Sequence, residues 1–296
     1  MRRARTIGLV AGLTLLAACG RGGGSRPGAL TVTDDAGRRV TLAAPAVRLV
    51  SLAPSLTELL FALGAGPQVV GRTTWCRYPA AAAAVPDVGD GLNPNLEAVA
   101  ARRPDLVLLY HSPLNETAAA QLERLGIAAV LLRQDRHADV ARHARLLGVL
   151  TGHPGAGDSI GRVLDSVVAA PAPAAGVRVA FVVWDAPPTV IGAGSYLDEL
   201  VTLAGGANVF HDLGPASATV SLETIADRDP GVIAILADRD AVVPPAWARR
   251  PEWRAVRAVR EGRFLVLPAD LFGRPSPRAP EAVAELRRLL AREATP

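Results

Sequence analysis

The chain has 296 residues, half of them hydrophobic, with 32 basic against 28 acidic side chains. This length and apolar content suffice for two α/β lobes or one large domain with a sizeable core. All the basic side chains are arginine, because the sequence contains no lysine. The absence of lysine excludes a P-loop for nucleotide phosphates. No clustered basic tract is present, which argues against nucleic-acid binding.

The N-terminal segment has the pattern of an export signal. Three arginines among the first five residues precede an uncharged, mostly apolar run from Ile7 to Ala18. Twelve helical residues span about 18 Å, which is too short for a hydrocarbon core of roughly 30 Å. We therefore predict that residues 1–18 are a signal peptide. Its removal would lower the net charge from +4 to about +1 (4 − 3).

Cys19 follows small residues at the end of this run, and Leu16 to Cys19 resembles a bacterial lipobox. The resemblance implies that Cys19 is lipidated, with an ordinary signal peptide and a chance cysteine as the alternative. Residues 19–29 are glycine-rich and predict a flexible linker. We expect an exported lipoprotein anchored in the periplasm or at the outer face of the cell membrane. With Cys19 acylated, Cys76 has no intrachain disulfide partner and is expected to be a small buried thiol.

The first half of the body alternates strand and helix patterns. Ser55 and Glu58 have capping-box spacing at the start of the first helix, and leucines recur there at helical intervals. Short apolar runs rich in β-branched residues indicate buried strands. The predicted strands are 47–52, 68–71, 104–109 and 128–132, and the predicted helices are 55–63, 95–100, 116–125 and 138–150.

The same pattern then begins again. Strands are predicted at 178–183 and 230–235, and helices at 195–203 and 222–226. The pair Leu96-Glu97 recurs 126 residues later as Leu222-Glu223, and Pro104 recurs as Pro230 at the same offset. Chance likeness between βα units is the alternative. The shared order and spacing favour a body built from two similar halves.

One amphipathic helix separates the halves. Residues 158–170 place apolar side chains at i, i+3, i+4, i+7 and i+8, which gives one apolar face. With its flanking residues this helix covers 156–173, between an N-terminal lobe (30–155) and a C-terminal lobe (174–296). The predicted fold class is α/β, with two Rossmann-like lobes joined by a single long connecting helix and a ligand cleft between the lobes.

Several motifs resemble the periplasmic binding proteins that serve importers of cobalamin, haem and iron-siderophores, most closely the cobalamin-binding branch. The resemblance covers about residue 30 to the end. It is carried by their order and spacing: Ser51 to Leu59 (SLAPSLTEL), Trp75 to Pro79 (WCRYP), Asn95-Leu96-Glu97, Ala204 to Phe210 (AGGANVF), Val220 to Glu223 (VSLE), Asp270, and Phe272 to Arg278 (FGRPSPR).

The resemblance implies how the protein contacts its transporter. In this family one surface glutamate on each lobe pairs with arginines of the membrane permease, and the matching positions are Glu97 and Glu223. The repeat selects the same two residues independently. Carboxylates on two separate lobes would fix the orientation of docking through charge-assisted hydrogen bonds. The alternative is that each glutamate caps a short helix. We expect a monomer whose partners are the ABC permease, the membrane through the lipid, and a small molecule.

The ligand cleft is predicted from scarce aromatic residues. The resemblance places Trp75, Tyr110, Asp270 and Arg274 at or near it. Trp184 is added because it lies at a strand end, where flat rings can stack on a flat macrocycle. Lobe packing is the alternative for the aromatics, and a structural ion pair is the alternative for Arg274. The branch carries further aromatics where this chain has Gly91, Ser217 and Leu271, which weakens the ligand assignment but not the family.

The sequence shows no catalytic set and no zinc-type motif. His111 follows Tyr110 at a strand end and could line the cleft, whereas His137 and His143 are expected on a solvated helix face. We therefore expect no enzyme, no metal site and no resident cofactor. The predicted function is a substrate-binding lipoprotein of an ABC importer that captures cobalamin or a related corrinoid. The alternatives are a haem or ferric-siderophore binding protein and, less favoured, a metal-dependent hydrolase.

Overall fold

The structure is a computed structural model that describes residues 29–170, 176–238, 241 and 243–293. The predicted signal peptide, Cys19 and nearly all of the predicted linker lie outside this range and stay predictions. Among the described residues, no helix combines the length and the apolar character needed to span a bilayer.

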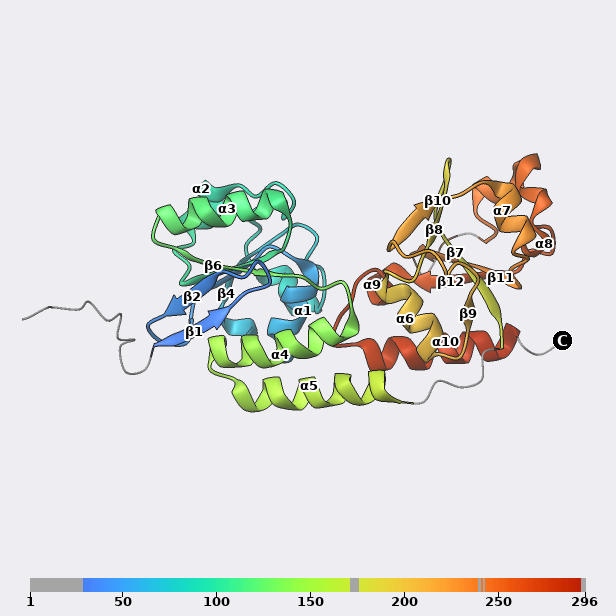
Figure 1. The fold of residues 1–296 in the computed structure, drawn as a ribbon. Coiled ribbons are helices and arrows are strands. Elements are labelled where there is room, and N and C mark those ends of the chain that lie inside the picture. The colour runs from blue at the N-terminus through green and yellow to red at the C-terminus, as the bar shows by residue number, and fades with distance from the viewer. Residues whose placement is uncertain (1–28, 171–175, 239–240, 242, 294–296) are drawn as a thin grey trace, which may run out of the picture.

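The N-terminal lobe is a parallel four-stranded sheet, ordered β4-β3-β5-β6, with helices on both faces (Figure 1). Its strands are β3 (Leu49–Ser51), β4 (Val69–Arg72), β5 (Leu106–Tyr110) and β6 (Ala128–Leu132), and its helices are α1 (Pro54–Ala62), α2 (Leu96–Ala101), α3 (Pro113–Arg124) and α4 (His137–Thr151), with 3-10 turns at Gly66–Gln68 and Ala80–Ala84 and a hairpin of β1 (Leu30–Thr33) and β2 (Arg39–Leu42).

Alternation along the strands explains the two helical layers. Leu106 and Leu108 face a core shared with α1 and α4, whereas Val107 and Leu109 face a core shared with α2 and α3. All four side chains are fully buried. Strands buried on both faces carry continuous apolar runs, which is the pattern that predicted them.

The C-terminal lobe repeats this plan and adds an antiparallel hairpin, in the order β10-β8-β7-β11-β12 with β9 also pairing with β7. Its strands are β7 (Arg178–Asp185), β8 (Pro188–Ile191), β9 (Ala207–Asn208), β10 (Ser217–Thr219), β11 (Val232–Ala237) and β12 (Phe264–Pro268), and its helices are α6 (Tyr196–Leu203), α7 (Leu222–Asp227), α8 (Arg257–Arg260), α9 (Ala269–Phe272) and α10 (Ala279–Glu293), with 3-10 turns at Ala246–Arg249 and Pro251–Ala255.

The internal repeat extends to the backbone conformation. The parallel order β4-β3-β5-β6 corresponds to β9-β7-β11-β12, and α2 and α7 start 126 residues apart (222 − 96). Arg103 and Asp229, at the same offset, are the two described residues other than glycine with positive φ, at 48° and 39°. The predicted two-lobed α/β fold class is confirmed.

The connecting helix is α5 (Pro154–Ala169), which begins before its apolar stripe. It packs along α4 so closely that a Cβ on Gly157 would lie 2.4 Å from the Ala144 carbonyl oxygen. Leu164 of α5 belongs to the N-terminal core, and Val167 packs against the C-terminal core. Helix α5 is therefore fixed to the first lobe and reaches the second at its end.

The predicted capping box of α1 is wrong. Helix α1 begins at Pro54, its N-cap is Ala53, and no side chain caps it. Ser55 and Glu58 are both buried. The Glu58 carboxylate is instead paired with two arginines that are distant in the sequence, described below.

Candidate functional site

A cavity of about 330 Å³ lies where the strands of the N-terminal lobe end and the C-terminal lobe begins. Leu52 follows β3, Trp75 lies beyond β4, Tyr110 ends β5 and Gln134 follows β6; Arg274 of the C-terminal lobe closes the other side. Carboxyl ends of parallel strands meet at one edge of a sheet, where α/β folds bind ligands. The cavity is therefore the candidate ligand site.

Two predicted aromatic residues meet at this cavity. Trp75 is 56% exposed and Tyr110 36% exposed, so both present ring surface to solvent. The Tyr110 hydroxyl donates to Asp135 Oδ1 at 2.7 Å. Burial and this hydrogen bond raise the pKa of Tyr110 to about 12, so the ring is neutral at physiological pH. The hydroxyl proton is thus already used in a hydrogen bond within the protein, so Tyr110 can contact a ligand mainly through its ring.

Trp184 does not line this cavity. It is 63% exposed at the end of β7, where its Nε1 donates to the Ala186 carbonyl oxygen at 2.9 Å. It borders a separate hollow of about 180 Å³ at the carboxyl ends of β7 and β11. Asp270 is exposed on α9 and is also not among the residues lining the 330 Å³ cavity.

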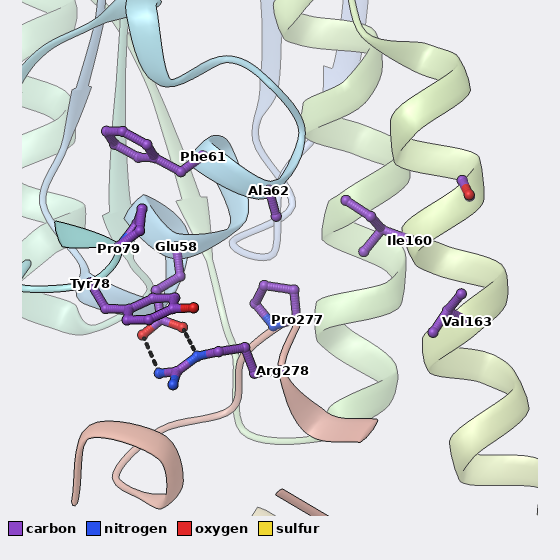
Figure 2. Close-up of a pocket in the computed structure, with 10 residues that line it drawn as sticks. Glu58, Phe61, Ala62, Tyr78, Pro79, Ile160, Val163, Pro277 and Arg278 are labelled. Atoms are coloured by element: carbon purple, nitrogen blue, oxygen red, sulfur yellow. Dashed lines mark hydrogen bonds and ion pairs between the residues drawn. The ribbon is translucent and has the colours of Figure 1, made fainter. Parts of the chain in front are cut away.

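Arg274 forms a structural ion pair across the two lobes. Its Nε donates to Glu58 Oε1 at 2.7 Å, and Arg278 Nε donates to Glu58 Oε2 at 3.1 Å. The Glu58 side chain is only 1% exposed. The Arg278 guanidinium also lies 3.7 Å from the centre of the Tyr78 ring (Figure 2). This buried cluster joins α1 to the loop before α10.

In a second cross-lobe contact the carboxylate belongs to the C-terminal lobe and its partners to the N-terminal lobe. Glu199 of α6 accepts from the His137 backbone amide at 3.0 Å and pairs with His137 Nδ1 at 2.9 Å and Arg136 at 3.1 Å. Burial alone would raise the pKa of Glu199, but the hydrogen bonds from His137 outweigh it and lower the pKa. His137 is 2% exposed, so its expected place on a solvated face was wrong.

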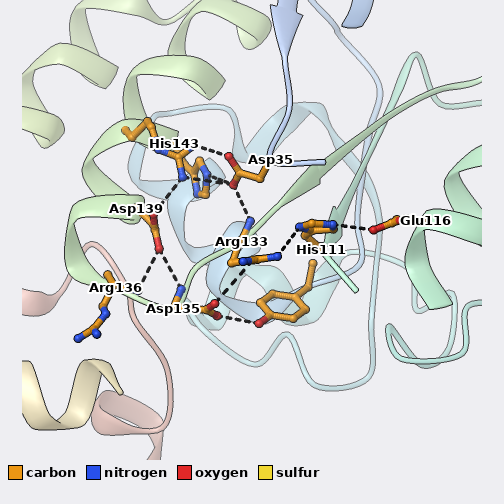
Figure 3. A network of polar contacts seen from close by, with 10 residues as sticks. Asp35, His111, Glu116, Arg133, Asp135, Arg136, Asp139 and His143 are labelled. Carbon is orange, nitrogen blue, oxygen red and sulfur yellow. Dashed lines mark hydrogen bonds and ion pairs between the residues drawn. The ribbon is translucent and has the colours of Figure 1, made fainter. Parts of the chain in front are cut away.

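His143 is likewise fully buried, contrary to expectation. Its Nε2 lies 2.8 Å from Asp35 Oδ2 (Figure 3). Burial alone would raise the pKa of Asp35, but hydrogen bonds from His143 and Arg142 hold it well below its usual range. His111 lies 2.7 Å from Glu116 and 3.1 Å from Arg133 (Figure 3). Both histidines have partners within the N-terminal lobe, and neither is among the residues that line the 330 Å³ cavity.

The departures from the cobalamin-binding pattern have structural reasons at two positions. A Cβ on Gly91 would lie 2.0 Å from the Leu52 carbonyl oxygen, so this backbone has no room for a side chain there. Leu271 is buried in the C-terminal core. Ser217 is exposed on β10. Cys76 is buried as expected, with Thr57 Oγ1 3.0 Å from its sulfur.

Glu97 and Glu223 occupy matching sites, each in the first turn of a short helix. The caps are instead Asn95 Oδ1 and Ser221 Oγ, which accept from backbone amides at 3.0 and 3.1 Å. Both glutamates are exposed, and neither forms an ion pair with any residue that the structure describes. A hydrogen bond from Ser221 lowers the pKa of Glu223. Helices α2 and α7 lie on the same side of the molecule, opposite α5 (Figure 1).

No group of three or more histidine, cysteine, aspartate or glutamate side chains that could hold a metal ion occurs within the described ranges. Two residues of this region were not predicted from the sequence. Glu58 was assigned to a helix cap, and Gln134, which lines the cavity, followed a predicted strand without any motif. No local signal indicates the observed role of either residue, because that role depends on the surroundings of the residue in the fold.

Comparisons with known proteins agree on one family. A family model described as "Periplasmic binding protein" matches residues 49–271. An uncharacterized ABC transporter substrate-binding lipoprotein of Bacillus subtilis, YvrC, is 28% identical, covering 87% of this chain and 84% of that protein. The crystal structure of the periplasmic vitamin B12 binding protein BtuF of Vibrio cholerae has a TM-score of 0.69 at 25% identity, covering 85% of this chain and 99% of that one. The periplasmic heme-binding protein BhuT, in complex with two hemes, has a TM-score of 0.72 at 28% identity, covering 84% and 99%.

Proposed function

We propose a ligand class and a docking mode for this chain, which belongs to the periplasmic binding protein family and is a substrate-binding protein of an ABC importer. The proposed ligand is cobalamin or a related corrinoid. The observation that carries this proposal is the cavity at the strand ends, bordered by two partly exposed flat rings, Trp75 and Tyr110. Such rings bind a flat macrocycle by stacking and by burying apolar area. The similarity to a vitamin B12-binding protein over most of both chains supports the same ligand class.

Haem is the second candidate, and a specific observation favours it. The heme-binding neighbour matches with a slightly higher TM-score and identity than the vitamin B12-binding one. Haem also offers a flat ring to Trp75 and Tyr110. It differs in carrying carboxylates, for which the cavity provides one cation, Arg274, already engaged with Glu58. This difference places the corrinoid first.

A binding titration tests the ligand. The full chain is titrated with cyanocobalamin and with haemin, followed by absorbance and by native mass spectrometry. We expect saturable 1:1 binding of cyanocobalamin, weakened about 10-fold or more by Trp75→Ala because the exposed ring supplies stacking area. Trp247→Ala is unsuitable as a control because that ring packs against Trp253, so Leu114→Ala, at an exposed leucine of α3, serves instead. Binding of haemin without cyanocobalamin would reverse the order.

The proposed docking mode uses Glu97 and Glu223 as contacts for arginines of the permease. Two exposed carboxylates on separate lobes, on one side of the molecule, could set both position and orientation. A hollow of about 350 Å³ between α2 and α3, bordered by Glu97 and Arg124, could receive a permease side chain. We also propose that a lipid on Cys19 holds the protein at the membrane during this exchange.

Uptake measurements in cells test the docking mode. The double variant Glu97→Ala, Glu223→Ala should abolish ligand uptake and leave ligand affinity within about twofold, because rim charges act on docking. Glu281→Ala is the matched control, since Glu281 is also an exposed first-turn glutamate but lies on α10. Normal uptake by the double variant, or a collapse of its ligand affinity, would refute the assignment.

A further inference from the structure

Gln134 is a buried amide with neither end hydrogen-bonded. It is 5% exposed, and neither its Nε2 nor its Oε1 has a partner among the residues that the structure describes. Most buried polar side-chain atoms in folded proteins are hydrogen-bonded, because an unpaired one loses its interactions with water without replacement. An amide with two unpaired ends therefore requires an explanation.

The other buried polar side chains with an unpaired atom are different. Gln68 and Asn115 each donate through their nitrogen to a backbone carbonyl, and His143 is bonded to Asp35 through Nε2. Each of these has one anchored end. Gln134 is the one such residue, within the described ranges, that lines the 330 Å³ cavity. The residue whose amide is unpaired at both ends therefore borders the candidate ligand site.

Two polar groups beside Gln134 already have hydrogen-bond partners in the protein. The Tyr110 hydroxyl donates to Asp135, and Arg274 Nε donates to Glu58. Asp90 also borders the cavity and adds a carboxylate that accepts hydrogen bonds and repels anions. The cavity thus combines ring surface, one carboxylate, one guanidinium and an amide that can donate and accept at once.

We infer that Gln134 binds a neutral carboxamide at the edge of the ligand and disfavours a carboxylate at that position. This inference rests on the proposed binding of a macrocycle in the cavity. A ligand carboxamide accepts from Gln134 Nε2 and donates to Gln134 Oε1, which satisfies both ends. A carboxylate can only accept, so its second oxygen would face Gln134 Oε1 without a proton between them. Gln134 would therefore select amide-bearing macrocycles over acid-bearing ones.

The test combines variants of Gln134 with ligands that differ in one group. The full chain is titrated with cyanocobalamin and with its three isomeric monocarboxylic acids, in each of which one propionamide is hydrolysed. In the wild type we expect one isomer to bind at least about 10-fold more weakly than cyanocobalamin, from the loss of paired hydrogen bonds. Gln134→Met keeps the side-chain length without hydrogen bonding. It should weaken cyanocobalamin by a similar factor and bind that isomer and cyanocobalamin equally.

Two controls separate this reading from a structural role. Gln121→Met, at an exposed glutamine of α3, should change no affinity. The Tm of unliganded Gln134→Met should rise by about 2–4 °C, because an unpaired buried amide is removed. A lower Tm would mean that Gln134 is a structural residue, and would overturn the inference.

The outcomes distinguish this inference from the proposed function. If the wild type binds cyanocobalamin but Gln134→Met binds it within twofold, the amide holds only water and the inference fails alone. Equal losses for cyanocobalamin and all three acids would indicate a steric effect and would also overturn it. If the wild type does not bind cyanocobalamin, the proposed corrinoid ligand fails and the inference falls with it.

Discussion

The variant Glu58→Gln should destabilise the protein more than loss of a surface charge would. The substitution keeps the side-chain volume and removes a charge from a carboxylate that is 1% exposed. It leaves two guanidiniums, with side chains 23% and 11% exposed, without their counter-charge. Breaking a buried ion pair by removing one partner costs about 3–5 kcal/mol. We expect the free energy of unfolding to fall by about that amount, a large part of a typical stability of about 5–15 kcal/mol.

Urea unfolding followed by far-UV circular dichroism measures this loss. Asp165→Asn is the control, because the Arg145–Asp165 pair has an N···O distance of 2.5 Å but side chains 37% and 54% exposed. Exposed pairs contribute about 0–1 kcal/mol, so the control should lie within that range of the wild type. A Glu58→Gln variant within about 1 kcal/mol of the wild type would refute the reasoning. It would mean that the free-energy cost of removing these charged groups from water equals the free energy of attraction between them.

Three further variants test other parts of the structure. Glu199→Gln should be less stable than the wild type at pH 7. The hydrogen bonds from His137 lower the pKa of Glu199 in the folded protein below its ordinary value of 4.5. The stabilisation by the ionised Glu199 is therefore present above that pH and is lost as the pH falls through the folded-state pKa. Urea unfolding between about pH 5 and pH 3 should show that the variant loses less stability than the wild type over this range. Gly157→Ala should lower the Tm by several degrees through a clash with α4, whereas Gly155→Ala, with open space around its Cα, should not. Tyr110→Phe keeps the ring and loses only the bond to Asp135, so titration should show a smaller loss of cyanocobalamin affinity than for Tyr110→Ala; equal losses would contradict a stacking role.

The sequence predicted the four strands of the N-terminal sheet, and β7 and β11 of the C-terminal lobe, because their signals are local. Strands buried on both faces need continuous apolar runs, and β6 was predicted with its observed bounds, Ala128–Leu132. The repeat was visible in the sequence because the two lobes have the same plan of strands and helices, with the same residue types at some equivalent positions. The structure extends it to the positive φ angles of Arg103 and Asp229.

The wrong predictions for Glu58, His137 and His143 share one cause: the partner of each side chain lies far away in the sequence. Glu58 has capping-box spacing, but its partners lie 216 and 220 residues away and outcompete the helix terminus. His137 and His143 lie on a helix with polar neighbours, but each is paired with a carboxylate 62 or 108 residues away. No local pattern encodes such a partner. Gln134 was missed for the same reason, since only the fold brings it to the cavity.

The cross-lobe ion pairs are reciprocal, and this affects how the cleft can work. Glu58 of the first lobe is held by arginines of the second, and Glu199 of the second lobe is held by His137 and Arg136 of the first. Helix α5 adds a covalent link that is packed tightly on α4. Wide separation of the lobes would have to break at least one buried or half-buried ion pair, so the cavity walls keep their spacing without ligand. A preformed cleft lowers the ordering cost of binding, and Gln134 is then held ready for the ligand instead of being brought to it by closure.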